Sequence, residues 1–146
     1  RQKLIDDPEK IPTAVEELLR WVSPIKNMNR TATRDTELRD QKIKEGDRLL
    51  LLYPSGNRDE SVYAEPNVLD VERSPNPHVA FGGYGTHHCL GASLARLELQ
   101  IMFEELTRRL PDLALASDQP LPQRASNFIT GIETMPVRFT PAPPRD

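Results

Sequence analysis

The strongest chemical signal in this 146-residue chain is a short segment that gathers its cysteine, its histidines and most of its glycines. The only cysteine is Cys89, all three histidines lie within residues 78–88, and four of the seven glycines lie within residues 82–91. Glycines let a backbone turn tightly and approach a flat ligand closely. A cysteine thiolate is a soft, electron-rich ligand for iron. The segment therefore predicts a ligand-binding loop with Cys89 as the candidate metal ligand.

A long helix is expected to follow this loop. Residues 92–110 are rich in strong helix formers, and Pro111 ends the pattern. Apolar residues spread over two sides of this helix, one of which is formed by Leu94, Leu97 and Ile101. Apolar surface that wide predicts a helix buried in a larger structure. Because the start of a helix favours negative charge, Cys89 just ahead of it is expected to be a thiolate.

Another helix is predicted over residues 14–22, where Leu18, Leu19 and Val22 lie at helical spacing. Thr13 is the expected N-terminal cap, and Pro24 stops the helix. Pro8 and Pro12 predict an irregular start to the chain. The helix at residues 14–22 is therefore expected to be the first helix along the chain, with none before Pro12.

Short strands are expected between residues 25 and 52. A turn at residues 45–47 precedes residues 49–53, an apolar run of strand length that predicts a buried strand. Prolines and glycines then punctuate residues 54–77, which predicts a long ordered loop, and a last short strand is expected at residues 135–139. Together these elements predict a mainly α fold with small β-sheets, in the α+β class.

The composition excludes several classes of protein. Hydrophobic residues make up 37% of the chain, which argues against disorder. The net charge of −3, from 19 basic and 22 acidic residues, leaves no basic block for a phosphate backbone, so we expect no nucleic-acid partner. A single cysteine excludes a disulfide scaffold and fits a reducing compartment, so a cytoplasmic protein is expected. The chain opens with charged residues rather than with the apolar run of a signal peptide. Because it starts at Arg1 rather than at Met, we expect a fragment.

Residues 81–91 closely resemble the haem-binding loop of the cytochrome P450 family. They read Phe-Gly-Gly-Tyr-Gly-Thr-His-His-Cys-Leu-Gly, and the common family pattern is Phe-Gly-x-Gly-x-His-x-Cys-x-Gly. Three further stretches resemble the family motifs Glu-x-x-Arg, Ala-Asn-Arg-Asp and Pro-x-x-Phe-Asp-x-x-Arg, and they are residues 17–20, 56–59 and 66–73. The loop has one residue more than the common pattern between Phe81 and Cys89. A subgroup of bacterial enzymes that hydroxylate steroid side chains shares this form.

The resemblance implies a role for the residues of the loop and for several outside it. It makes Cys89 the axial thiolate ligand of the iron in haem b, a ligand that favours O–O cleavage in this family. His87 and Arg30 are implied to bind the haem propionates, and His78 is implied to lie near the haem edge. The implied cofactor-binding loop is completed by Phe81, Gly83 and Gly91.

The same resemblance implies a buried charge network. It would consist of Glu17, Arg20 and Arg73 and would support the cysteine loop. Without the resemblance, Glu17 and Arg20 would be interpreted as a solvent-exposed pair on one helix face, and Arg30 as an exposed arginine. The two interpretations differ in the burial that they predict for these side chains.

The activity implied by the resemblance is that of a haem-thiolate monooxygenase, which inserts one oxygen atom from O2 into a C–H bond. Candidate contacts to a hydrophobic substrate are Ile25, Met28, Phe128 and Ile129. The sequence around them most resembles that of bacterial sterol (cholesterol) side-chain hydroxylases. The implied partners are a ferredoxin and its reductase, which pass on electrons ultimately from NAD(P)H. Residues 1–146 are expected to be the C-terminal part of a single domain without its oxygen-activation helix, and therefore inactive alone.

Two other interpretations remain open. A non-catalytic haem- or zinc-binding fragment would use His78, His87 and Cys89, although paired Cys-x-x-Cys or His-x-x-x-His spacing is missing. A cysteine nucleophile activated by His87 is disfavoured, because no histidine lies outside this segment to act as a separate base.

Overall fold

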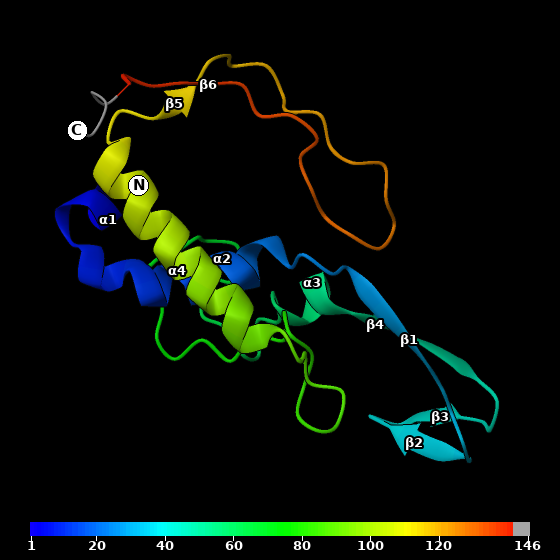
Figure 1. The fold of residues 1–146 in the computed structure, drawn as a ribbon. Coiled ribbons are helices and arrows are strands. Elements are labelled where there is room, and N and C mark those ends of the chain that lie inside the picture. The colour runs from blue at the N-terminus through cyan, green and yellow to red at the C-terminus, as the bar shows by residue number, and fades with distance from the viewer. Residues whose placement is uncertain (142–146) are drawn as a thin grey trace.

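The structure, a computed structural model, describes residues 1–141. Its longest helix, α4, packs against α1 and α2, and α3 contacts α2 (Figure 1). In chain order the helices are α1 (Gln2–Asp6), the 3-10 turn η1 (Pro8–Lys10), α2 (Ile11–Val22), α3 (Tyr53–Gly56) and α4 (Ala92–Arg109). Helices combined with small two-stranded sheets confirm the predicted α+β class.

The start of α2 differs from the prediction. The helix begins at Ile11 with Lys10 as its N-cap, so Thr13 lies inside it and is not the cap. Pro12 is tolerated because backbone N–H groups in the first turn of a helix have no partner within the helix. The expected irregular start is also wrong, since residues 2–10 form α1 and η1. At its other end α2 stops before Pro24 as predicted, with Ser23 in the left-handed conformation at φ 45°.

Helix α4 confirms the prediction of a long helix after the cysteine loop. Its partly buried residues Leu99 and Phe103 pack against the core. The side formed by Leu94, Leu97 and Ile101 stays 50–59% exposed. Burial of that side in a larger structure therefore remains a prediction.

Within residues 1–141, three antiparallel two-stranded sheets make up the remaining regular structure, which confirms the expected short strands. The pairs are β1 (Asn27–Thr31) with β4 (Arg48–Leu52), β2 (Thr36–Leu38) with β3 (Gln41–Ile43), and β5 (Ala114–Leu115) with β6 (Val137–Arg138). The strand expected at residues 135–139 is thus shorter than predicted. The expected burial of β4 is wrong: Leu50 and Leu52 are more than half exposed. Within the described residues β4 pairs with β1 alone, and this ribbon extends away from the helices (Figure 1).

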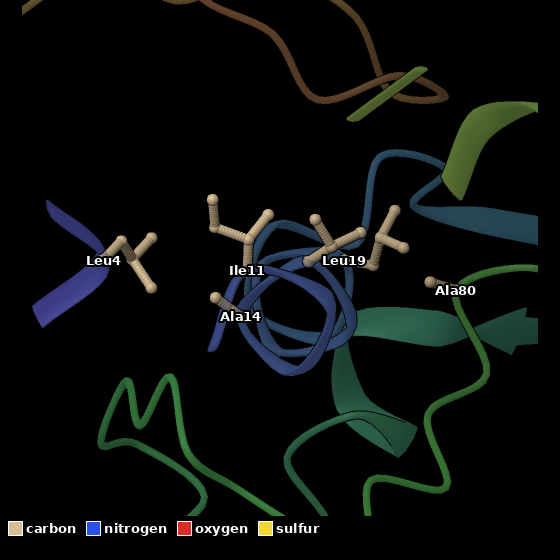
Figure 2. Packing of buried hydrophobic residues seen from close by; sticks show 6 residues of the cluster. Leu4, Ile11, Ala14, Leu19 and Ala80 are labelled. Atoms are coloured by element: carbon tan, nitrogen blue, oxygen red, sulfur yellow. The ribbon is translucent and has the colours of Figure 1, made fainter. Parts of the chain in front are cut away.

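The hydrophobic core lies along one face of α2. Figure 2 shows Leu4 of α1, then Ile11, Ala14 and Leu19 of α2, and Ala80 of the loop that precedes Cys89. Phe81 is partly buried and packs against this cluster. The core therefore anchors the start of the cysteine loop to α2.

The long ordered loop predicted over residues 54–77 is present, but it begins after α3, at residue 57, and continues to residue 91. Residues 57–91 contain no helix or strand, yet Asn57, Tyr63 and Ala80 within them are buried. Within residues 1–141, every helix is too short or too polar to cross a membrane. The long loop, rather than a regular element, carries most of the candidate site.

Candidate functional site

Cys89 lies at the end of the long loop, just ahead of α4. Its backbone N–H donates to the carbonyl of Phe81 at 3.0 Å, and its carbonyl accepts from the N–H of Ala92 at 3.2 Å. Gly91 is the N-cap of α4, and a Cβ placed there would be 3.9 Å from the Cys89 sulfur. The residue is exposed. The thiol is therefore accessible and lies beside the start of a helix, where backbone N–H groups favour negative charge.

Two glycines of the loop adopt a conformation that favours glycine. Gly82 has φ 85° and Gly85 has φ 111°, both in the left-handed region. Gly83 does not have a positive φ, and nothing lies within 4 Å of a Cβ built on it. The backbone thus requires Gly82 and Gly85, whereas the expected contact of Gly83 with a cofactor stays a prediction.

A cavity of about 300 Å³ opens beside Cys89. Its walls are mostly apolar and come from three parts of the sequence, residues 19–28, residue 53 and residues 80–89. The lining residues are Leu19, Pro24, Ile25, Met28, Tyr53, Ala80, Phe81, Gly82, His87 and Cys89. The structure therefore brings the candidate iron ligand, the candidate propionate ligand His87 and two candidate substrate contacts to one cavity.

The segments that hold the other substrate candidates run side by side. Ile25 and Ile129 form an antiparallel bridge, the Lys26 N–H donates to the Phe128 carbonyl at 2.8 Å, and the Thr130 N–H donates to the Pro24 carbonyl at 2.8 Å. Phe128 and Ile129 themselves are 40% and 41% exposed and are not among the lining residues of the cavity. They lie next to the cavity wall rather than in it.

Arg30 is not brought to the cavity. It lies on β1 opposite Leu49, is exposed, and donates from its guanidinium to the carbonyl of Asn29 at 2.8 Å. That hydrogen bond is to a neighbouring residue and leaves most of the guanidinium donors available. Its contact with a propionate stays a prediction.

Glu17 and Arg20 on α2 form a fully buried ion pair. Two hydrogen bonds of 2.7 Å join the Arg20 guanidinium to the two carboxylate oxygens of Glu17. Arg73, from the long loop, donates from its Nε to the same carboxylate at 3.2 and 3.3 Å. Both members of the pair are 0% exposed, so the alternative of a solvent-exposed pair is wrong.

This network links α2 to the loop that leads to Cys89. Arg20 also donates to the carbonyls of Asn57, Pro66 and Val68 at 2.8, 2.9 and 3.2 Å. The Asn57 side chain in turn accepts from the Val79 N–H at 2.8 Å. The network therefore reaches to within two residues of Phe81, where the cysteine loop begins.

The charges in the network are maintained by hydrogen bonding. Burial alone would raise the pKa of Glu17, but hydrogen bonds from Arg20, the Asp70 N–H and Arg73 hold it below its ordinary value. The hydrogen bonds to Glu17 likewise raise the pKa of Arg20. The pair is therefore ionised in spite of complete burial.

Sequence reasoning missed several members of this network. Asn57 is fully buried and bridges Ser23 and Val79 through its side-chain amide. Tyr63 stacks under the Arg20 guanidinium, whose carbon lies 5.1 Å from the ring centroid. The motif at residues 56–59 pointed to the segment of Asn57, but nothing in the sequence indicated its partners.

The structure does not bring His78 to the cavity. Its side chain is only 2% exposed, its Nε2 lies 2.9 Å from a carboxylate oxygen of Glu16, and its Nδ1 accepts from the Ala80 N–H at 3.2 Å. Both ring nitrogens thus have protein partners and are not available to a ligand in the cavity, whereas a position of His78 near the haem edge stays a prediction. A zinc site of His78, His87 and Cys89 fails for the same reason, and residues 1–141 contain no cluster of three metal-binding side chains.

Curated proteins are similar in sequence to this chain over most of its length. The sequence model of the family Cytochrome P450 matches residues 9–136. A Steroid C26-monooxygenase of Mycolicibacterium smegmatis is 52% identical over 141 residues, which cover 97% of this chain and 35% of that protein. A Methyl-branched lipid omega-hydroxylase of Mycobacterium bovis is 51% identical over 129 residues, which cover 88% of this chain and 30% of that protein.

Solved structures share the fold as well. The crystal structure of P450BioI, in complex with hexadec-9Z-enoic acid ligated acyl carrier protein, matches with a TM-score of 0.91 at 42% sequence identity. The match covers 95% of this chain and 36% of that chain, so the chain spans about a third of the length of these relatives. The extent of the family match, together with identities above half, shows that the chain belongs to the cytochrome P450 family.

Proposed function

We propose that residues 1–146 are the C-terminal part of a single-domain haem-thiolate monooxygenase that inserts one oxygen atom from O2 into a C–H bond of a hydrophobic substrate. One observation carries the proposal: an exposed cysteine at the start of α4 lines an apolar cavity together with His87 and Phe81. Membership of the cytochrome P450 family supports it. The oxygen-activation helix would belong to the part of the enzyme that precedes this chain.

The residues around the cavity fit haem b. A thiolate-ligated haem requires a cysteine for its iron, apolar walls for its ring and polar groups for its propionates. Cys89 would hold the iron, the lining would contact the ring, and His87 would bind a propionate. Arg30, which lies on β1 outside the lining, is proposed as a second propionate ligand. When bound, haem b supplies the activation of O2, with electrons that come ultimately from NAD(P)H.

The chain's own residues prepare the sulfur for this role. The backbone N–H groups at the start of α4 stabilise negative charge near Cys89. The bond from the Cys89 N–H to the Phe81 carbonyl closes the loop, and the positive φ angles of Gly82 and Gly85 make the turn possible. The cavity beside the sulfur has mostly apolar walls, which suit the flat apolar surface of a haem.

For the substrate we propose a hydrophobic molecule with a long branched chain, either a sterol side chain or a methyl-branched lipid. Ile25 and Met28 line the cavity, and the bridge to Ile129 places Phe128 beside them. The names of the two relatives, a steroid C26-monooxygenase and a methyl-branched lipid omega-hydroxylase, support this class. We further propose a ferredoxin and its reductase as partners, and a cytoplasmic location, which the single unpaired cysteine supports.

Turnover of the full-length protein tests the activity. The enzyme is combined with a ferredoxin, its reductase, NAD(P)H and isotope-labelled O2, and offered a sterol or a methyl-branched fatty acid. We expect a hydroxylated product that carries one labelled oxygen atom from O2. Product with oxygen from water, or no product from either lipid, would overturn the proposal.

Substrate binding tests the cavity independently. Met28→Ala and Ile25→Ala are expected to weaken lipid binding by about 1–2 kcal/mol, which is a five- to thirtyfold rise in Kd. The type I spectral shift on lipid titration measures this Kd. Leu38→Ala is the matched control, because Leu38 is exposed on β2 and outside the cavity. Equal Kd values for all three variants would remove the proposed substrate contacts.

A further inference from the structure

Three charged or titratable side chains outside the cavity join three separate segments. Glu16 of α2 accepts two hydrogen bonds from Arg96 of α4, from Nε at 2.7 Å and from a terminal nitrogen at 2.9 Å. The same carboxylate accepts from Nε2 of His78, in the long loop, at 2.9 Å. Because His78 Nδ1 accepts from the Ala80 N–H, the ring proton is on Nε2. We call Glu16, His78 and Arg96 the clamp.

The clamp is partly buried and its charges balance. The His78 side chain is 2% exposed, while Glu16 and Arg96 are 29% and 33% exposed. Burial lowers the pKa of His78, and the bond to Glu16 offsets this only in part, so the ring is neutral near neutral pH. Burial raises the pKa of Glu16, but bonds from Arg96 and His78 bring it below its ordinary value. One anion and one cation therefore remain.

The clamp contacts the residue that begins the cysteine loop. The guanidinium carbon of Arg96 lies 4.6 Å from the ring centroid of Phe81, a cation–π contact, and the His78 ring centroid lies 6.0 Å from the same ring. The Phe81 carbonyl accepts the Cys89 N–H, and both residues line the cavity. A continuous chain of contacts thus runs from Glu16 to Cys89.

We propose that Glu16, His78 and Arg96 are positioning residues that hold Phe81 in place and thereby set how Cys89 presents its sulfur to the haem. The inference rests on the proposed function. The loop between Phe81 and Cys89 is one residue longer than the common family pattern, which gives it more freedom to move. Arg96 restrains the Phe81 end of the loop from α4, the same helix that fixes the Cys89 end.

The test compares variants of the full-length holoenzyme. Arg96→Gln removes both the fork to Glu16 and the contact with Phe81. We expect a smaller fraction of the reduced carbon monoxide complex to show the red-shifted band of thiolate ligation. We also expect haem transfer to apomyoglobin to accelerate by about tenfold or more, because residues that orient a metal ligand typically contribute that much to affinity.

Milder variants and a control distinguish a positioning role from a general loss of stability. Arg96→Lys keeps the charge but loses the fork, and Glu16→Gln loses the charge but keeps a hydrogen-bonding group, so both should fall between wild type and Arg96→Gln. Arg108→Gln is the control, because it breaks a 2.7 Å pair with Glu105 on the exposed side of the same helix. It should leave both readouts at wild-type values.

The outcomes distinguish this inference from the function on which it rests. Wild-type protein without a thiolate-ligated haem would overturn the proposed function and the clamp with it. A normal wild-type spectrum with unchanged band fraction and haem transfer in Arg96→Lys and Glu16→Gln would overturn the clamp alone, even if Arg96→Gln did not fold. Lower thermal stability with an unchanged band fraction would equally contradict a positioning role.

Discussion

Replacing Arg20 with methionine tests the buried network that supports the cysteine loop. Arg20 makes two bonds to Glu17 and three to backbone carbonyls, all from a side chain that is 0% exposed. Methionine fills much of the same space but leaves Glu17 with the longer bonds from Arg73, at 3.2 and 3.3 Å, as its remaining side-chain cation. The change therefore leaves a buried carboxylate poorly compensated.

The expected cost follows from that geometry. Removing one partner of a buried ion pair typically costs about 3–5 kcal/mol, and the total stability of a protein is commonly about 5–15 kcal/mol. Arg20→Met should therefore lower the free energy of unfolding by about 3–5 kcal/mol. Arg108→Gln, which breaks an exposed pair, should change it by less than about 0.5 kcal/mol.

Urea unfolding followed by circular dichroism measures these differences in the full-length protein. Glu17→Gln and the double variant Glu17→Gln/Arg20→Met complete a double-mutant cycle. Because both single changes break the same pair, the double variant should cost less than their sum by at least about 1 kcal/mol. A loss below about 1 kcal/mol for Arg20→Met, or additive single effects, would refute this account of the network.

Three further predictions follow from the loop and its titrating groups. Gly85→Ala should destabilise the protein by about 1–2 kcal/mol because of its positive φ, whereas Gly83→Ala should be near neutral, as measured by urea unfolding. Burial lowers the pKa of His78, so stability should fall as the pH drops below 6.5; unfolding at about pH 7.5 and about pH 5.5 should show a smaller fall for His78→Gln. The pKa of Glu17 is held below 4.5, so the free energy of unfolding should fall again below that pH. Glu17→Gln should make this fall at acidic pH smaller. If a variant and the wild type lost stability equally as the pH falls, the assignment of that pH dependence to His78 or to Glu17 would be contradicted.

Local sequence patterns predicted the elements that depend on neighbouring residues. The spacing of apolar residues correctly predicted α4. The i, i+3 spacing of Glu17 and Arg20 correctly predicted that the two side chains interact on one turn of a helix. The glycines of the cysteine loop indicated tight turns, and two of them have the expected positive φ. These features need no knowledge of distant segments.

Features that depend on distant segments were missed or misread. His78 and Glu16 are 62 positions apart, and Glu16 and Arg96 are 80 apart, so no local pattern reveals their contact. The resemblance implied a position near the haem edge for His78 but gave no sign that both of its ring nitrogens have protein partners. The leucines of β4 suggested burial, which depends on what packs against the strand rather than on the strand itself.

The absorption spectrum of the reduced full-length protein with carbon monoxide tests the central claim most directly. We predict a strongly red-shifted Soret band for the wild type and its loss in Cys89→Ser, because the thiolate of Cys89 would be the axial ligand of the haem iron. A haem spectrum without that shift, or the same shift retained in Cys89→Ser, would contradict the claim.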